Sequence, residues 1–198
     1  MRKTLLLASI ITIISNSGCS TNTPSLKRSN SVNNIPNPAS FNSQKEQMLS
    51  YINQIRAKGT VCAPPAGPLS WNNTLEQAAQ SHVKDMALND TVTHMGSGTS
   101  LDPAKSGIGM GSTFIDRIKY FGYKVKTGQL VGENLTKTNI KITKSSEIMP
   151  NYKRAIENLI NDKPHCKIIM NPRFSDIGMA MFKRGDNYYF TMDLAERQ

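Results

Sequence analysis

A histidine and a cysteine are adjacent at His165-Cys166, and a proline stop, Asn171-Pro172, follows them. His165 can ligate a metal or carry a proton, because an imidazole changes its charge near neutral pH. Cys166 can tie the same position covalently to a distant segment. A residue that precedes proline disfavours the helical conformation, so no helix continues through Asn171-Pro172. We therefore expect His165 at the exit of a helix, beside a cysteine that is covalently tied to another segment.

The first of the three cysteines, Cys19, lies in a segment with the form of an export signal. Arg2 and Lys3 precede an apolar run of about ten residues, which is too short to span a bilayer. Gly18-Cys19-Ser20 then resembles a bacterial lipobox, in which the cysteine becomes the lipidated first residue. Asn16 stands where an aliphatic residue is usual, so ordinary secretion with cleavage nearby is the alternative. We predict a signal segment over residues 1–18 and lipidation of Cys19.

The other two cysteines, Cys62 and Cys166, are expected to pair with each other. With Cys19 carrying lipid, they alone remain, and an oxidising space outside the cytoplasm favours a disulfide. Such a bond closes a loop of about a hundred residues, for which chain entropy gives roughly 4 to 5 kcal/mol. The alternative is two independent buried thiols.

The segment after the signal differs in composition from the rest of the chain. Residues 19–42 are rich in Ser, Asn, Thr and Pro, which is typical of a solvated tether. We expect this tether to connect a membrane anchor to one folded domain over residues 43–198. The predicted location is the bacterial cell envelope, or otherwise the medium if the protein is simply secreted.

The net charge of +10 comes from scattered basic residues. It could favour contact with anionic envelope components. Nucleic acid is not an expected partner, because the chain has no basic run or recognised binding module.

The periodicity of the folded part predicts helices first and strands last. Helical spacing predicts four helices. The first covers about 44–58, the second is capped by Asn73, the third covers about 113–121, and the fourth ends near 161. A strand is expected at 130–135, and alternation over 177–182 and 188–194 predicts a terminal hairpin. This order indicates an α+β fold whose sheet is covered by helices.

Two further features belong to this part of the chain. His82 shares a helix face with apolar residues, so we interpret it as a hydrogen-bonded core histidine rather than a ligand. The segment 95–111 is rich in glycine and is expected to form a long surface loop.

The motifs, taken together in order, resemble the CAP superfamily, also called the SCP or PR-1-like domain, in its bacterial form. The resemblance covers residues 44–198 and implies an α-β-α sandwich with a C-terminal antiparallel hairpin. It also implies a cleft lined by two histidines and acidic residues, which sometimes holds a divalent cation. The matching residues are Leu69, Trp71, Leu75, Ala79, His82, Asp85, Met86, Ala87, His94, Gly111-Ser112, Arg117, Gly122-Tyr123, Gly132-Glu133-Asn134, His165-Cys166, Ile169 to Pro172, Phe174 and Gly178.

By position, the resemblance places His94, Glu133 and His165 in that cleft. Two neutral imidazoles and a carboxylate can give a zinc-like ion three bonds and leave one position open. The same set can relay protons. A third reading is that the three groups hydrogen-bond one another and only hold loops together.

The sequence departs from the family pattern at two places. A second glutamate of the family is absent, and Leu159 and Asp162 stand in that region. Asp162 either replaces this glutamate as a ligand or terminates the helix. The loop between His94 and Gly111 is longer than the family's His-x-Gly-Asp-Gly-Ser turn and lacks its aspartate there, which is expected to reshape or partly cover the cleft entrance.

We expect a monomeric binding protein whose cleft takes a small ligand, an envelope component or a divalent cation such as zinc, with no catalysis assumed. No nucleophile with an adjacent base is evident, since Cys166 is assigned to a disulfide. One alternative is a metal-dependent, peptidase-like hydrolase with Glu133 as base and histidine-held metal. The other alternative is lipid or sterol binding, which the family resemblance also implies.

Overall fold

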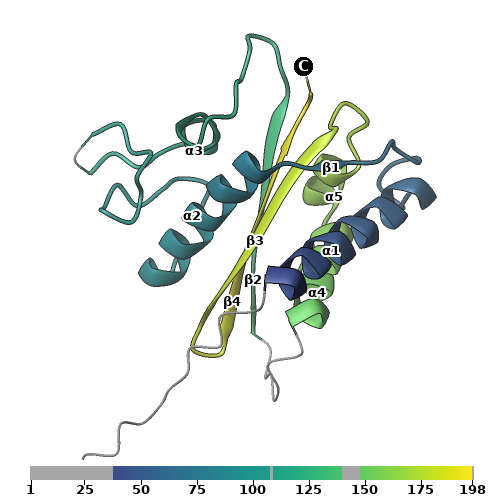
Figure 1. Ribbon diagram of the computed structural model, residues 1–198, viewed down its shortest axis with the longest axis horizontal. Helices are drawn as coiled ribbons and strands as arrows, with labels where there is room; N and C mark the ends of the chain where they lie inside the picture. Colours follow the sequence, from purple (N-terminus) through teal and green to yellow (C-terminus); the bar gives the residue numbers. More distant parts are fainter. Residues whose placement is uncertain (1–37, 108, 140–147, 198) are drawn as a thin grey trace, which may run out of the picture. The chain divides into compact units, whose positions relative to one another are not determined.

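The computed structural model in Figure 1 describes residues 38–107, 109–139 and 148–197. The predicted signal segment 1–18, Cys19 and the tether up to residue 37 lie outside these residues. No helix within the described ranges is long and apolar enough to cross a membrane.

Within the described residues, four strands form one mixed sheet in the order β1-β3-β4-β2. They are β1 (Ser70–Trp71), β2 (Val131–Asn139), β3 (Asp176–Arg184) and β4 (Asn187–Ala195). β1 is parallel to β3, whereas β3 with β4 and β4 with β2 are antiparallel. The predicted terminal hairpin is confirmed. β2 is longer than its predicted range, and β1 was not predicted because its two residues are too few to show alternation.

In the described part of the chain, five helices accompany the sheet. They are α1 (Pro38–Lys58), α2 (Asn73–Asn89), α3 (Phe114–Tyr120), α4 (Ile148–Asn161) and α5 (Lys163–Ile169). α1 begins at Pro38 rather than near residue 44 and includes the last residues of the expected tether, because proline is well tolerated in a first helical turn. α2 is capped by Asn72, whose side chain accepts from the backbone N–H groups of Thr74 and Leu75, so the predicted cap Asn73 is wrong by one residue.

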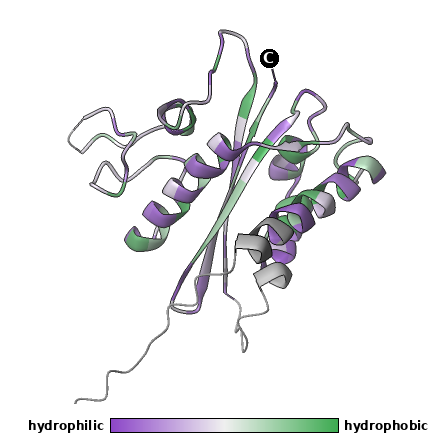
Figure 2. Cartoon of the chain, viewed as in Figure 1, coloured by the Kyte–Doolittle hydropathy of each residue, from purple (hydrophilic) through white to green (hydrophobic). Residues whose placement is uncertain are grey.

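The helices cover both faces of the sheet, as the predicted α-β-α sandwich requires (Figure 1). Ile177 and Met179 of β3 pack in a core with residues of α1, α4 and α5. Ala180 packs on the other face with Ala79 and other residues of α2. A Cβ atom at Gly178 would lie 2.1 Å from the backbone nitrogen of Glu76, so glycine is needed where α2 meets the sheet. Figure 2 shows hydrophilic and hydrophobic residues mixed along α1 and α2, as expected for helices with one buried face.

His165 lies at the start of a helix, so the predicted position at a helix exit is wrong. α4 ends at Asn161, and Asp162 caps a separate helix, α5, that carries Pro164 in its first turn. Proline is tolerated in the first turn of a helix but not in its interior, so Pro164 prevents a continued α4, and an aspartate cap favours a new start. The predicted stop before Asn171-Pro172 agrees with the structure, since α5 ends at Ile169.

The predicted disulfide between Cys62 and Cys166 is present and spans 104 residues. It attaches the Pro-rich loop after α1 to α5. Arg56 of α1 reinforces the same junction, because its buried guanidinium donates to the carbonyl oxygens of Gly67, Ile169, Asn171 and Phe174. The element that carries His165 is therefore fixed by one covalent and several polar contacts.

Replacing both Cys62 and Cys166 with serine should lower the free energy of unfolding by about 2 to 5 kcal/mol, because the unfolded chain loses its cross-link. Denaturant unfolding monitored by circular dichroism measures this change. Cys19→Ser is the control and should leave the unfolding midpoint unchanged. A double variant as stable as the parent protein would show that the disulfide contributes nothing.

Candidate functional site

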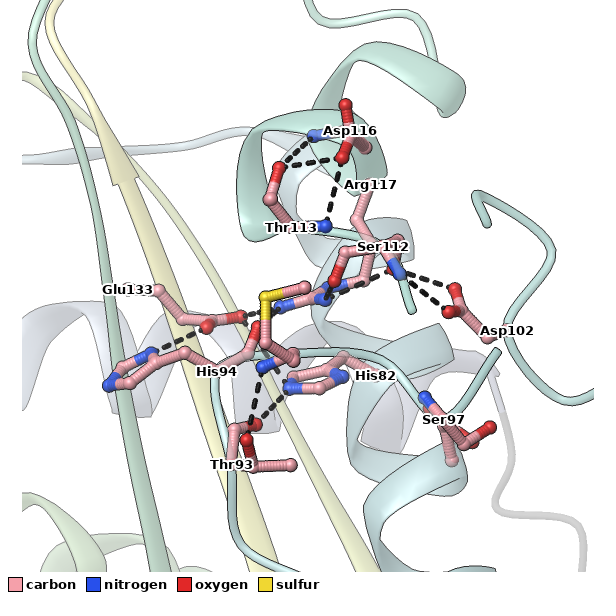
Figure 3. A network of polar contacts seen from close by, with 12 residues as sticks. His82, Thr93, His94, Ser97, Asp102, Ser112, Thr113, Asp116, Arg117 and Glu133 are labelled. Atoms are coloured by element: carbon pink, nitrogen blue, oxygen red, sulfur yellow. Dashed lines mark hydrogen bonds and ion pairs between the residues drawn. The ribbon is translucent and has the colours of Figure 1, made fainter. Parts of the chain in front are cut away.

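The carboxylate of Glu133 lies at the centre of a buried polar network (Figure 3). Glu133 is on β2 and is only 3% exposed. Its Oε1 accepts a hydrogen bond from Nδ1 of His94 at 2.8 Å, and its Oε2 accepts from Nη2 of Arg117 at 2.7 Å. The structure therefore brings together two of the three predicted site residues, His94 and Glu133, and adds Arg117 to them.

Arg117 of α3 is a site residue to which the sequence assigned no role. Its side chain is 1% exposed. Nη1 donates to the carbonyl oxygen of Ser112 at 3.0 Å, and Nη2 donates to the carbonyl oxygen of His94 at 3.0 Å. Arg117 thus holds the backbone of His94 directly and its ring through Glu133.

The electrostatics of the network favour a charged Glu133. Burial acts to raise the pKa of Glu133, but the hydrogen bond from His94 and the charge of Arg117 outweigh it and hold this pKa below its usual value. The hydrogen bond to Glu133 raises the pKa of His94. The His94 ring is 56% exposed, and its Nδ1 is taken by Glu133. Its Nε2 is the atom left for a ligand.

His82 is a buried histidine beneath this site, in agreement with its interpretation as a core residue. Its Nε2 lies 2.8 Å from the carbonyl oxygen of Thr93, and its side chain is 1% exposed. Burial lowers the pKa of His82. Nε2 also lies 4.0 Å from Oε2 of Glu133, a proximity that the apolar helix face did not indicate.

Asp193 of β4 is a second buried acid that sequence reasoning missed. It stands opposite Glu133 in the β2–β4 register and is 1% exposed. Within the described residues no N–H or O–H group donates to either of its carboxylate oxygens. Burial, followed by the negative charge of Glu133, raises the pKa of Asp193 well above its usual value. In the sequence, the only sign of this buried acid was its place between apolar residues of the predicted hairpin. Alternation alone does not show that both faces of β4 are buried.

The third predicted site residue, His165, lies in the first turn of α5. Its Nδ1 hydrogen-bonds Oδ2 of Asp162, the residue that caps α5. Its carbonyl oxygen accepts from Nδ2 of Asn134 at 3.2 Å. Asp162 thus both separates α4 from α5 and contacts the histidine. No hydrogen bond or ion pair in the described ranges joins His165 to His94 or Glu133.

The two predicted metal-ligating histidines stand in separate clusters. Residues 38–107, 109–139 and 148–197 contain no group of three or more His, Cys, Asp or Glu side chains placed to hold a metal ion. The two histidines nevertheless share one feature. Each has Nδ1 bound to a carboxylate, Glu133 for His94 and Asp162 for His165.

The long loop between His94 and Gly111 is closed at its base. The backbone N–H of Gly96 donates to the carbonyl oxygen of Ser112 at 2.8 Å. A Cβ atom at Gly111 would lie 1.8 Å from the oxygen of Gly96, so only glycine permits this approach. The aspartate missing from the expected turn has a counterpart inside the loop, since Asp102 accepts from the hydroxyl of Ser112 at 2.6 Å.

Comparison with known proteins identifies the domain. The family model described as the cysteine-rich secretory protein family, CAP, matches residues 49–194. An outer surface protein of Borrelia burgdorferi is 19% identical, with a TM-score of 0.52 over 79% of this chain and 94% of that one. An extracellular protein of Bacillus anthracis that contains an SCP domain is also 19% identical, with a TM-score of 0.57 over 82% of this chain and 44% of that one. No curated protein matches the chain. At these identities the two solved structures show the fold alone.

Arg117→Met should lower the free energy of unfolding by about 3 to 5 kcal/mol, because it leaves the buried Glu133 carboxylate without its charged partner. Arg173→Met is the matched control. It breaks the exposed pair with Glu196, which water and salt screen, so it should leave the unfolding midpoint almost unchanged. Urea unfolding measures both. Equal effects of the two variants would contradict the central place given to the buried pair.

Asp193→Asn should stabilise the protein at pH 7 by about 1 to 3 kcal/mol, because the amide removes an ionisation that burial and the charge of Glu133 oppose. Folding raises the pKa of this acid, so the folded protein favours its protonated form. The resulting contribution to stability is complete below the unfolded pKa of about 3.9 and is lost as the pH rises. The gain should therefore shrink between pH 7 and pH 4. Urea unfolding at both pH values tests this, and a loss of stability at pH 7 would refute it.

Proposed function

Because the chain belongs to the cysteine-rich secretory protein family, CAP, we propose that it binds a divalent cation such as zinc through Nε2 of His94 and Nε2 of His165. One observation carries this proposal. Both histidines have Nδ1 bound to a carboxylate, which fixes the ring and leaves Nε2 with its lone pair toward a ligand. Histidines that bind metals almost always have such a partner, which also makes the imidazole a stronger ligand.

The strand β2 supports this assignment because consecutive residues hold the two histidines. Glu133 bonds the ring of His94, and Asn134 bonds the backbone of His165. Successive side chains of a strand point to opposite faces. One histidine therefore approaches from the α2 and α3 side of the sheet and the other from the α5 side. We infer that the cation lies between them, beside β2.

The donor set suits zinc with an incomplete protein shell. Imidazole nitrogen is a preferred zinc ligand, and two histidines leave positions for water or for oxygen atoms of a small ligand. Both oxygens of Glu133 already accept hydrogen bonds from His94 and Arg117, so we place Glu133 behind His94 rather than among the ligands. Asp162 has the same role behind His165.

The surroundings of Glu133 favour binding over the peptidase-like alternative. A general base must accept a proton from water, and its efficiency follows its pKa. The pKa of Glu133 is held below its usual value by His94 and Arg117, in opposition to its burial, which makes Glu133 a weak base. Both of its carboxylate oxygens also accept hydrogen bonds, from His94 and Arg117. A cation in this site would therefore hold a ligand in place.

We extend the proposal to the location of the protein. The Cys62–Cys166 disulfide fits an oxidising compartment outside the cytoplasm. The two similar solved structures are described as an outer surface protein and an extracellular protein. Lipidation of Cys19 would attach this chain to the cell envelope.

Titration calorimetry of the purified protein with zinc at pH 7.5 should give a dissociation constant below about 1 μM, since two oriented histidines ligate the ion. His94→Ala and His165→Ala should each remove this binding. Lys167→Gln, an exposed change on α5, is the control and should retain it. The affinity should fall as the pH drops toward about 6.5, because protonated imidazoles cannot ligate a metal and the pKa of His94 is raised above this usual value.

Two results would contradict the proposed function. The first is the absence of any heat of binding with zinc or another divalent cation. The second is zinc binding that persists in His94→Ala, which would place the ion elsewhere.

A further inference from the structure

The part of the loop after His94 that the structure describes as residues 97–107 is anchored by two buried carboxylates, Asp85 and Asp102. Oδ2 of Asp85 accepts from the backbone N–H of Ser97 at 2.8 Å. Asp102 lies inside the loop, is 2% exposed, and accepts from the backbone N–H of Gly98 at 3.2 Å. These contacts hold Ser97 and Gly98 in place. They also give two similar anchors whose effects can be compared.

Of these two carboxylates, Asp102 is the one that also contacts Ser112. Its carboxylate accepts from the backbone N–H of Ser112 at 2.8 Å and from the Ser112 hydroxyl at 2.6 Å. Burial acts to raise the pKa of Asp102, but the hydrogen bonds from Ser112 and Gly98 outweigh it and hold this pKa below its usual value. The loop therefore presents an ionised carboxylate to Ser112.

Ser112 connects Asp102 to Arg117 of the site. Its carbonyl oxygen and its hydroxyl accept from Nη1 of Arg117 at 3.0 and 3.2 Å. Nη2 of Arg117 then donates to Glu133, which bonds His94. Figure 3 shows this chain of contacts from Asp102 to the His94 ring. Ser112 is fully buried and Arg117 nearly so, so neither can replace a lost partner with bulk water.

We propose that Asp102 is a positioning residue for the cation site, acting on the His94 ring through Ser112, Arg117 and Glu133. The loop that lengthens the segment after His94 thereby supports the site. Without Asp102, the N–H and hydroxyl of Ser112 lose their acceptor, and the hydroxyl that accepts from Nη1 of Arg117 is no longer fixed. Glu133 then holds Nδ1 of His94 less firmly. The effect on cation affinity rests on the proposed function, whereas the effect on the ring does not.

The test is the tautomer of neutral His94, measured without metal by nitrogen-15 NMR of the purified protein at a pH above the His94 pKa. In the parent protein the bond to Glu133 should keep the proton on Nδ1. In Asp102→Ala and in Ser112→Ala the ring should become a mixture that includes the Nε2–H form. Zinc affinity should fall by about tenfold in both, the lower end of the effect expected for residues behind a ligand.

Asp85→Ala is the matched control, because it removes the other buried loop anchor without touching Ser112. It should leave the His94 tautomer as in the parent protein. If Asp102→Ala does not fold, Ser112→Ala carries the test. The proposal is overturned if neither variant changes the tautomer, or if Asp85→Ala changes it equally. A changed tautomer in a protein that binds no zinc would support the positioning role and reject only the cation function.

Discussion

The buried ion pair between Glu133 and Arg117 is the constraint on which the site depends. A carboxylate removed from water must be compensated by charge and by hydrogen bonds, since an unpaired buried charge is costly. Here Arg117 supplies the charge, and His94 supplies the second bond. The same guanidinium also holds the backbone of His94 and of Ser112. The positions of α3, β2 and the segment after α2 are therefore fixed together by one pair.

The two histidines are held by different means. His94 is held by the polar network around Glu133. His165 sits on a short helix that is fixed by the Cys62–Cys166 disulfide and by Arg56. β2 joins the two halves, because Asn134 contacts the backbone of His165 next to Glu133. A cation between the histidines would thus connect two independently stabilised parts of one domain.

The sequence predicted the layers of the fold and part of the site, and each failure has a physical reason. Helical and alternating periodicity located most elements, because burial of one face leaves a local pattern. The cysteine count gave the disulfide. Arg117, Asp102 and Asp193 were assigned no role, because their importance comes from burial and from partners that are distant along the chain. The error at His165 arose because Asp162 caps a second helix where only the end of the preceding helix was expected.

The central claim is that a divalent cation binds to His94 and His165 while Glu133 remains behind His94. A crystal structure of the zinc-treated protein, with anomalous data at the zinc edge, tests it most directly. The account predicts a zinc ion about 2.0 to 2.1 Å from both Nε2 atoms, with Glu133 still bonded to Nδ1 of His94 and to Arg117. A zinc ion ligated by Glu133 itself, or bound away from both histidines, would contradict it.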